Sequence, residues 1–488
     1  MIVKEWFKQL EYELLQGDLE QEAAEVVYDS RKAAPGAVFV CIKGTRNDSH
    51  DFIPAVLAAG VTVLVTERRV EVPVEVTVIQ VHNGRQALAE LSAARFGYPA
   101  RRMMMIGVTG TKGKTTTTHM IKAIMEAAGK KTGMIGTNGV YIGEERYPTV
   151  NTTPESYDLH RYFLQMAEAG CECCVMEVSS QAFKMHRVDG IIYDCAVFTN
   201  ISPDHIGPDE HADFAEYLYY KTRIFHQARY ALINQDDDHF DAVKEAAVCD
   251  YSCFSLQAGA EFEAVDIHYV SEPEFVGLEF TITGDYHLKV RVNIPGKFNV
   301  YNALAATAAA LSAGVPAEKI VHALEHLRID GRMEIVYTCE KFCVIVDYAH
   351  NAVSMESLLL ALREYHPRRL VCVFGCGGNR SKDRRYSMGE ISGRLADLSI
   401  ITADNSRFEK VEDIIADIRG SIEKTGGSFL EIPDRREAIA YSITHAEEGD
   451  MIAIIGKGHE DYQEIEGVRY PFLDRTVVEE TVRHGGED

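Results

Sequence analysis

The stretch that decides the fold reads Met103-Met-Met-Ile-Gly-Val-Thr-Gly-Thr-Lys-Gly-Lys-Thr-Thr-Thr117. An apolar run, typical of a buried strand, passes into a glycine-rich loop that opens directly onto a helix-forming segment. Such a loop turns its backbone N–H groups inward around phosphate oxygens, and the helix that follows adds the positive end of its dipole. The stretch therefore predicts a nucleotide phosphate site at the end of a strand in an α/β sheet.

Within this loop, Lys114 is expected to reach the β- and γ-phosphates of ATP, and Thr115 is expected to bind Mg²⁺. The pattern G-x-x-x-x-G-K-[ST] is not met in full, because its first glycine would fall at Val108. A chance match is the alternative, and the order of strand, loop and helix argues against it. The predicted nucleotide-binding residues of the loop are Gly110, Thr111, Lys112, Gly113, Lys114, Thr115 and Thr116.

Length and charge limit the classes of protein to consider. The 488 residues suffice for about three domains. The formal net charge of -24 would repel nucleic acid and anionic lipid. No apolar run is long enough to span a bilayer, and the first ten residues lack the core of a signal peptide. We expect a cytoplasmic monomer that acts on small molecules, without nucleic acid and without membrane insertion.

The eleven cysteines show no spacing typical of a zinc site. Several lie in apolar, strand-like runs, where reduced cysteine behaves as a small hydrophobic residue. These are Cys173, Cys174, Cys195, Cys343 and Cys372.

The predicted fold class is α/β with three domains: residues 1–98, a central domain at 99–330 with a parallel sheet around the phosphate loop, and a Rossmann-like domain at 331–488. Gly97 and Pro99 mark the first boundary and Asp330-Gly-Arg332 the second. In the third domain strands alternate with helices, which predicts a mostly parallel, doubly wound sheet. We expect strands at 342–346, 370–374, 398–402, 429–432 and 451–455, and helices at 354–365, near 388, at 411–424 and at 435–446.

Five further motifs carry a resemblance to a known family: Asp29-Ser-Arg31, Asn151-Thr-Thr-Pro154, Glu177-Val-Ser-Ser180, Asp347-Tyr-Ala-His350 and Gly456-Lys-Gly-His-Glu460. In this order along the whole chain they resemble the Mur ligases of peptidoglycan synthesis, in particular the MurE type. The resemblance implies an ATP- and Mg²⁺-dependent amide ligase. Such an enzyme phosphorylates the D-glutamate carboxylate of UDP-MurNAc-L-Ala-D-Glu, and the amine of a diamino acid then displaces the phosphate.

The resemblance also assigns roles to single residues. It implies that Lys114, Glu177, His205 and Lys221 are catalytic, that Thr115, Glu177, His205 and Lys221 bind metal, and that Lys221 is N-carboxylated. Asn302, Arg332 and Asp347 would complete the ATP site, and residues 1–98 would bind the UDP-substrate. The residues implied for that substrate are Ser30, Thr152, Thr153, Ser179 and Arg187. The alternative for three of these residues is a purely structural role. Glu177 would be a helix N-cap or part of an ion pair, His205 an ordinary loop histidine, and Lys221 an ordinary lysine.

The incoming amino acid is implied to contact Arg385, Asp404, Asn405, Ser406, Arg407, Gly456 and Glu460. Asp404-Asn-Ser-Arg407 stands where diaminopimelate ligases usually have D-N-P-R and lysine ligases D-N-P-A. A guanidinium suits the second carboxylate of diaminopimelate and would repel the terminal ammonium of lysine. The expected substrate is meso-diaminopimelate, with lysine or ornithine as the alternative.

Two other functions compete with this interpretation. A ligase of the folylpolyglutamate synthase type is suggested by Asn351, since the Mur ligases usually have D-Y-A-H-T-P at that point. The Asp29-Ser-Arg31 region argues against it, because an enzyme that acts on folate does not need a domain that binds UDP. A non-catalytic nucleotide-binding homologue is the second alternative, and the presence of Lys114, Thr115, Glu177 and Lys221 argues against that one.

Overall fold

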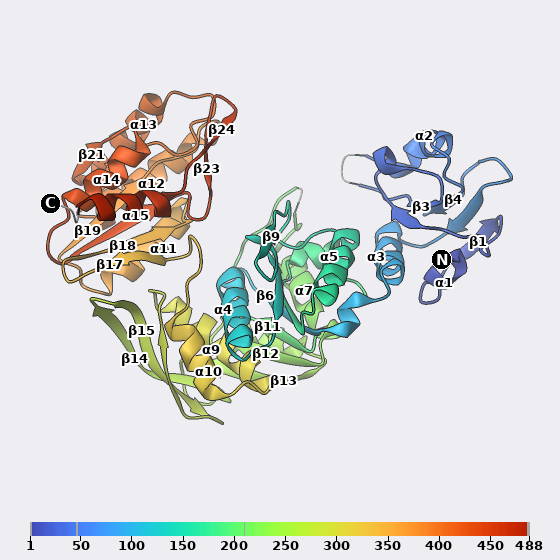
Figure 1. The fold of residues 1–488 in the computed structure, drawn as a ribbon, viewed down its shortest axis with the longest axis horizontal. Helices are drawn as coiled ribbons and strands as arrows, with labels where there is room; N and C mark the ends of the chain where they lie inside the picture. The colour runs from blue at the N-terminus through green and yellow to red at the C-terminus, as the bar shows by residue number, and fades with distance from the viewer. Residues whose placement is uncertain (1, 45–46, 209, 486–488) are drawn as a thin grey trace. The chain divides into compact units, whose positions relative to one another are not determined.

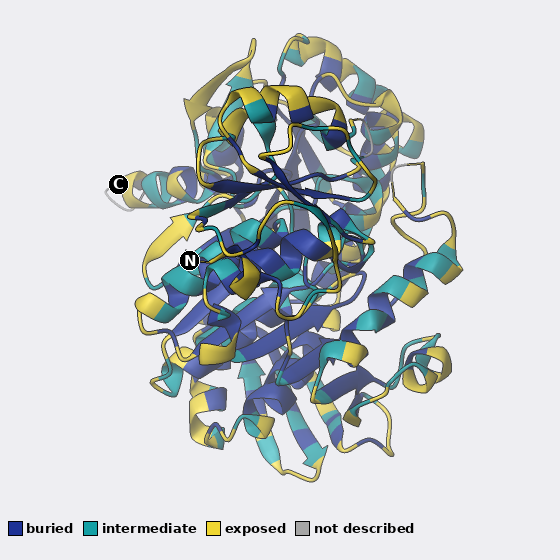
Figure 2. Ribbon diagram, turned by 90° about the vertical axis from the view of Figure 1, so that its right-hand side faces the viewer, coloured by how far each residue is buried: buried dark blue, intermediate teal, exposed yellow. Residues whose placement is uncertain are grey.

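The computed structural model describes residues 2–44, 47–208 and 210–485. The chain divides into two compact units. Figure 1 labels the helices and strands along the chain. Unit 1 comprises Met1–Glu263 and Leu304–Ile320, and unit 2 comprises Ala264–Ala303 and Val321–Asp488. In both units the central strands of the sheets are mostly buried, and the exposed residues lie on turns, on outer helix faces and on some edge strands (Figure 2).

Unit 1 begins with a five-stranded sheet in the order β1-β5-β4-β3-β2. Strands β2 to β5 run parallel, and β1 pairs antiparallel with β5. The Val, Phe and Leu residues of β3 and β4 are buried, as expected for strands covered on both faces. The elements are α1 (Val3–Trp6), β1 (Glu13–Gln16), β2 (Glu25–Val27), β3 (Ala37–Val40), α2 (Ile53–Ala58), β4 (Val63–Thr66), β5 (Thr77–Gln80) and α3 (Gly84–Arg95).

The second sheet has eleven strands, and the eight that lie wholly in unit 1 run in the order β13-β12-β11-β6-β10-β7-β8-β9. Strands β13 to β7 are parallel, and β8 and β9 are antiparallel. Strand β6 lies between β10 and β11, so the loop after β6 lies beside the carboxyl ends of both neighbours. The strands are β6 (Met104–Thr109), β7 (Thr132–Gly136), β8 (Gly139–Ile142), β9 (Glu145–Tyr147), β10 (Cys173–Glu177), β11 (Cys195–Phe198), β12 (Tyr230–Asn234) and β13 (Asp250–Ser255). The helices are α4 (Lys114–Ala127), α5 (Ser156–Glu168), α6 (Ser180–Lys184), α7 (Phe214–Thr222) and α8 (Phe240–Glu245).

Unit 2 contains a six-stranded sheet in the order β17-β18-β22-β19-β20-β21, in which only the β17–β18 pair is antiparallel. The chain moves outward from β18 to β21 and then returns to place β22 in the middle. This reversal puts the connecting helices on two faces, which is the doubly wound arrangement. The strands are β17 (Glu334–Thr338), β18 (Phe342–Asp347), β19 (Arg369–Phe374), β20 (Leu398–Ile401), β21 (Phe429–Glu431) and β22 (Asp450–Ile455). The helices are α11 (Ala352–Arg363), α12 (Lys382–Leu395), α13 (Val411–Thr425), α14 (Arg435–Thr444) and α15 (Asp474–Gly485).

The remaining elements are three long or antiparallel strands, two helices and a short hairpin. Strands β15 and β16 pair antiparallel, and so do β23 and β24. Strand β14 and helices α9 and α10 each begin in one unit and end in the other. These elements are β14 (Phe262–Glu272), β15 (Phe275–Gly284), β16 (Leu288–Val292), α9 (Phe298–Ser312), α10 (Ala317–Glu325), β23 (Tyr462–Ile465) and β24 (Val468–Pro471).

These three sheets with their helices confirm the predicted α/β class, the central parallel sheet and the Rossmann-like third part. The domain boundaries at 98 and 330 stay predictions. Of the eleven cysteines only Cys249 and Cys339 are partly exposed, and the five expected in strands are all buried. Among the described residues, no helix is both long and apolar enough to cross a membrane.

One ion pair in the interior of unit 2 fixes the carboxyl ends of two strands. Arg435 donates to both carboxylate oxygens of Asp474 at 2.7 Å, and neither side chain is exposed. The same guanidinium donates to the carbonyl oxygens of Ala403 and Ile455, at 3.3 and 3.0 Å. Because Ala403 follows β20 and Ile455 ends β22, the pair holds the two loops that come next.

Replacing Asp474 with alanine is expected to destabilise unit 2 strongly, because the mutation leaves a buried guanidinium without its carboxylate. We expect a loss of about 3–5 kcal/mol in the free energy of opening of α15 and β22, measured by amide hydrogen exchange. The control is Glu480→Ala, which removes the exposed partner of Arg436 between the same two helices. That loss should be about 0–1 kcal/mol. Equal effects of the two mutations would contradict the central role of the buried pair.

Candidate active site

The phosphate loop is held open by the strand next to it. Gly110 and Gly113 have φ angles of +152° and +85°, and a Cβ on Gly110 would lie 1.8 Å from Thr199 Oγ1. Asn200 accepts a hydrogen bond from the Lys112 N–H at 2.9 Å and donates to the Lys112 carbonyl at 3.0 Å. Glycine is therefore required at position 110, and the loop cannot collapse onto β11.

The two loop residues predicted to meet phosphate and metal both lie in the first turn of α4. Lys114 Nζ donates to the carbonyl oxygens of Gly110 and Thr111, at 2.9 and 3.1 Å. Thr115 Oγ1 donates to Glu177 Oε1 at 2.9 Å. The lysine ammonium and the threonine hydroxyl thus lie at the start of α4, where its dipole also favours an anion.

Glu177, the last residue of β10, is a buried carboxylate held by neutral donors. Its side chain accepts hydrogen bonds from Thr115 Oγ1, from the Thr137 N–H at 2.9 Å and from Thr137 Oγ1 at 3.2 Å. The residue is 1% exposed. Neutral donors do not balance a buried charge, so a divalent cation fits beside Glu177, with Thr115 as a second ligand.

Tyr217 of α7 connects the phosphate loop with Lys221. Its hydroxyl lies 3.0 Å from Thr111 Oγ1, and its ring centroid lies 4.6 Å from Lys221 Nζ. Both side chains are buried. Burial and the nearby Lys114 ammonium lower the pKa of Lys221 well below its ordinary value, and Asp204 opposes this only in part. A lowered pKa makes the ammonium group easier to deprotonate, and the neutral amine is the form that can react with CO₂.

Two histidines of the loop before α7 have different environments. His205 is half exposed with φ of +54°, and its Nδ1 lies 2.9 Å from Glu210 Oε1. His211 is fully buried, and its Nε2 lies 2.8 Å from Ser180 Oγ. His205 can thus turn toward a ligand, whereas His211 fixes the loop to α6. Among the described residues, no three His, Cys, Asp or Glu side chains form a metal-binding group, so a cation here would need phosphate, hydroxyl or carbamate oxygens as well.

Four of the residues predicted for the UDP-substrate lie together. Thr153 Oγ1 donates to the Glu177 carbonyl at 2.9 Å and to Ser179 Oγ at 3.4 Å, and Thr152 Oγ1 lies 3.1 Å from Thr137 Oγ1. Arg187 donates to the Thr153 carbonyl at 3.2 Å. The fifth residue, Ser30, is not part of these contacts. It begins a short 3₁₀ turn between β2 and β3.

Arg187 shares a carboxylate with an arginine that the motifs do not contain. Its Nε donates to Glu155 Oε1 at 2.9 Å, and Arg85 Nη1 lies 3.5 Å from Glu155 Oε2. Two guanidinium groups on one carboxylate leave a net positive charge beside Thr153. This excess charge suits an anionic substrate group.

Three predicted ATP contacts belong to unit 2. Asn302 Nδ2 donates to Asn299 Oδ1 at 2.8 Å within α9. Asp347 accepts the N–H groups of Met333 and Ala349, both at 2.7 Å, and its burial raises the pKa of its carboxyl group despite the nearby Arg332. The Arg332 guanidinium lies over the Tyr348 ring, 5.1 Å from its centroid. Asp347 and Arg332 are thus neighbours, and their contact with nucleotide stays a prediction.

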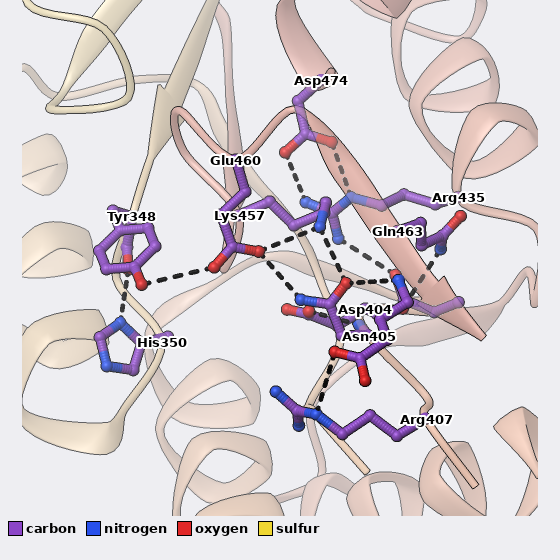
Figure 3. Close-up of polar contacts among 12 residues, drawn as sticks. Tyr348, His350, Asp404, Asn405, Arg407, Arg435, Lys457, Glu460, Gln463 and Asp474 are labelled. Carbon is purple, nitrogen blue, oxygen red and sulfur yellow. Dashed lines mark hydrogen bonds and ion pairs between the residues drawn. The ribbon is translucent and has the colours of Figure 1, made fainter. Parts of the chain in front are cut away.

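Six of the seven residues predicted to bind the amino acid follow β20 or β22, and Figure 3 shows four of them: Asp404, Asn405, Arg407 and Glu460. Asn405 Nδ2 donates to Glu460 Oε2 at 2.9 Å, and Lys457 Nζ lies 3.2 Å from both Glu460 Oε2 and Asn405 Oδ1. Gly456 has a φ of +112°, and a Cβ there would lie 2.7 Å from Asp404 Oδ2. One hydrogen-bonded network therefore joins the Asp404 loop to the Gly456 loop.

Arg407 and Arg385 have different roles in this region. Arg407 is in the left-handed region with φ of +51°, donates to the Gly378 carbonyl at 2.8 Å, and lies 3.5 Å from Glu464 Oε2. Arg385 is buried and donates to Glu409 at 2.8 Å and to Asp417 at 2.9 Å. The Arg385 guanidinium forms ion pairs with both carboxylates, and the pair with Glu409 anchors the segment that follows Ser406. Direct contact of Arg385 with a substrate stays a prediction.

Sequence reasoning missed five residues that shape these sites. The buried tyrosine, the shared carboxylate and the two arginines lie outside every motif. The buried lysine lies inside a motif, but no role was assigned to it. A signal was present for Lys457, because it lies between two residues that were assigned. The missed residues are Arg85, Glu155, Tyr217, Arg435 and Lys457.

Three family profiles match successive parts of the chain. They are the Mur ligase family catalytic domain at residues 22–96, the Mur ligase middle domain at 108–310, and the Mur ligase glutamate ligase domain at 331–458. Together they span all three predicted domains.

Individual relatives match over nearly the full length. A Clostridium perfringens protein named UDP-N-acetylmuramoyl-L-alanyl-D-glutamate--2,6-diaminopimelate ligase is 38% identical over 485 residues, 98% of this chain and 99% of the relative. A Geobacillus thermodenitrificans protein of the same name is 40% identical over 466 residues, 93% of this chain and 94% of the relative. A solved structure with that enzyme's name aligns with a TM-score of 0.76 and 29% identity, covering 100% of this chain and 99% of that one.

Replacing Lys221 with alanine tests whether its side chain is an N-carboxylated metal ligand. ATP-dependent turnover should fall by about 10- to 100-fold, because an oxygen ligand is lost. Acetate or propionate should restore part of it by placing a free carboxylate in the vacated space. Lys122→Ala, which removes a lysine paired with Glu126 on α4, serves as the control and should change little. A crystal structure of the active complex with unmodified Lys221 far from metal would refute the prediction.

Proposed function

The chain belongs to the Mur ligase family, and on that premise we propose that it joins 2,6-diaminopimelate, in its meso form, to UDP-N-acetylmuramoyl-L-alanyl-D-glutamate. The reaction consumes ATP and belongs to peptidoglycan biosynthesis. The relatives that match over nearly the whole chain carry the name of this reaction. The proposal for this chain also rests on its own side chains.

The observation that carries the choice of amino acid is the network of polar contacts that links the loop of Arg407 with Glu460. Arg407 and Asn405 lie on the same loop, and Asn405 is hydrogen-bonded to Glu460 at 2.9 Å. A guanidinium and a carboxylate on two linked loops match a substrate end that carries both a carboxylate and an ammonium group. Diaminopimelate has such a group at each end, whereas the side chains of lysine and ornithine end in an ammonium alone.

The chemistry proceeds in two balanced steps. A carboxylate oxygen of D-glutamate attacks the γ-phosphorus of ATP, the bond to the bridging oxygen breaks, and ADP leaves. The amine nitrogen of the amino acid then attacks the acyl carbon, inorganic phosphate leaves with the C–O bonding electrons, and the nitrogen loses a proton. Carboxylate is a poor electrophile, so the first step supplies the leaving group that the second step requires.

The residues of unit 1 serve the first step. The loop N–H groups and Lys114 hold the phosphates and offset the charge on the transferring group. Thr115 and Glu177 would hold Mg²⁺, with His205 and a carboxylated Lys221 as further ligands, and the ion adds positive charge at the phosphates. Arg187, with Arg85 behind the same Glu155, would orient the anionic acceptor.

The alternatives have less support. Asn351, which suggested a folylpolyglutamate synthase, is the N-cap of α11, where its Oδ1 accepts the Ser354 N–H at 2.9 Å. Asparagine at this position is explained by the cap alone. Residues 22–96 match the Mur ligase family catalytic domain, which also disfavours a folate substrate. A non-catalytic role would leave the buried Glu177 and Lys221 without purpose.

We also propose that the protein acts as a monomer in the cytoplasm, where ATP is available. Size-exclusion chromatography with light scattering measures the oligomeric state directly.

The proposed function is tested by ADP release from the purified protein with UDP-MurNAc-L-Ala-D-Glu and a panel of amino acids. We expect turnover with meso-diaminopimelate at a kcat/KM at least about tenfold above that with lysine or ornithine, because a missing charge partner costs more than 1.4 kcal/mol. Folate replaces the UDP-substrate in a parallel reaction and should give no turnover. A preference for lysine, or turnover with folate, would reject the assignment.

Arg407→Ala tests how the amino acid is selected. The value of kcat/KM for diaminopimelate should fall by the equivalent of about 2–5 kcal/mol, because the distal carboxylate loses its partner in a partly buried site. The value for lysine should change far less. The control is Arg419→Ala, which removes a more exposed arginine of α13 that pairs with Glu431 of β21. If the Arg407 mutation lowers every amino acid equally, then Arg407 shapes the loop and does not read the carboxylate.

A further inference from the structure

Lys457 is a lysine without solvent exposure, and it lies among residues predicted to bind the amino acid (Figure 3). It follows Gly456 at the carboxyl end of β22. Its Nζ lies 3.2 Å from Asn405 Oδ1 and 3.2 Å from Glu460 Oε2, and 5.3 Å from the centroid of the Tyr462 ring. Burying an ammonium group is expensive unless it is paired. The two oxygens that pair with it belong to residues proposed to bind substrate.

The two carboxylate oxygens of Glu460 are unequally occupied. Oε2 receives Asn405 Nδ2 at 2.9 Å and Lys457 Nζ at 3.2 Å. Oε1 receives the Tyr348 hydroxyl at 3.4 Å, which is a long and weak contact. A carboxylate offers about four lone-pair sites in all. Oε1 is therefore the oxygen with room for a strong donor from outside the protein.

Lys457 also fixes which way the Asn405 amide points. A lysine ammonium has no acceptor, so the amide atom that faces it must be the oxygen. The Glu464 N–H donates to the same Oδ1 at 2.9 Å. With Oδ1 held by two donors, the Asn405 NH₂ group is directed to Glu460, and both residues take one orientation.

We propose that Lys457 is a positioning residue for the incoming amino acid. By holding Oε2 of Glu460 and the oxygen of Asn405, it presents Oε1 of Glu460 to the ammonium group of an amino-acid substrate. This role rests on the proposed function, and it assigns to Lys457 a share of amino-acid affinity and none of the phosphoryl transfer. Lys457 itself donates to protein oxygens and has no need to contact the substrate.

The experiment uses Lys457→Met in the full-length chain, since methionine has a similar length and volume without charge or donor. The KM for meso-diaminopimelate should rise at least about tenfold, because a buried charge partner is lost. The KM values for ATP and for the UDP-substrate should stay within about twofold. Lys424→Met is the matched control, because Lys424 is exposed on α13 of the same unit and should leave all three constants unchanged. Lys457→Gln keeps a donor and should give an intermediate rise, and it replaces the methionine variant if that variant does not fold.

The outcomes separate this inference from the function on which it rests. If the wild-type protein does not turn over diaminopimelate, both the proposed function and the role of Lys457 are rejected. If the wild type is active and the KM for diaminopimelate is unchanged in the variants, only the role of Lys457 is rejected. A parallel rise in all three KM values, with a lower melting temperature, would mean that Lys457 is structural, and it too overturns the proposal.

Discussion

Both candidate sites depend on one constraint, which is that parallel strands end at the same edge of a sheet. In unit 1 this edge collects the loop after β6, Glu177 at the end of β10, and Thr199 after β11. In unit 2 it collects the loops after β18, β20 and β22. The side chains that could do chemistry come from segments distant in sequence, and the sheet brings them within hydrogen-bonding distance.

In unit 2 the constraint is reinforced by a buried charge. Arg435 holds the carbonyl oxygens of Ala403 and Ile455, and Asp474 balances its charge. The loop after β22 contains a second buried cation, Lys457, balanced by Glu460. Two such pairs cost desolvation energy that an apolar core would not. What they supply is a fixed geometry for loops that have no regular structure of their own.

Much of the fold follows from the sequence pattern. The alternation of apolar runs and helical segments in the third domain locates its strands and helices to within a few residues: β18 was expected at 342–346 and is Phe342–Asp347, and α11 was expected at 354–365 and is Ala352–Arg363. Glycines and strand ends also located the phosphate loop. The antiparallel strands β15 and β16 were not foreseen, although β15 is ten residues long and mostly buried. The pairings of Glu155 with two arginines, and of Tyr217 with Thr111 and Lys221, arise only when distant segments meet.

The distribution of cysteines has a practical consequence for following motion in this protein. Nine of the eleven thiols are buried, and the two partly exposed ones, Cys249 and Cys339, lie in different units. Thiol reagents reach exposed sulfur first. A pair of fluorescent dyes or spin labels can therefore be attached to the natural chain, one in each unit, without introducing a cysteine. The distance between the labels would then report directly how the separation of the two units changes as substrates are added.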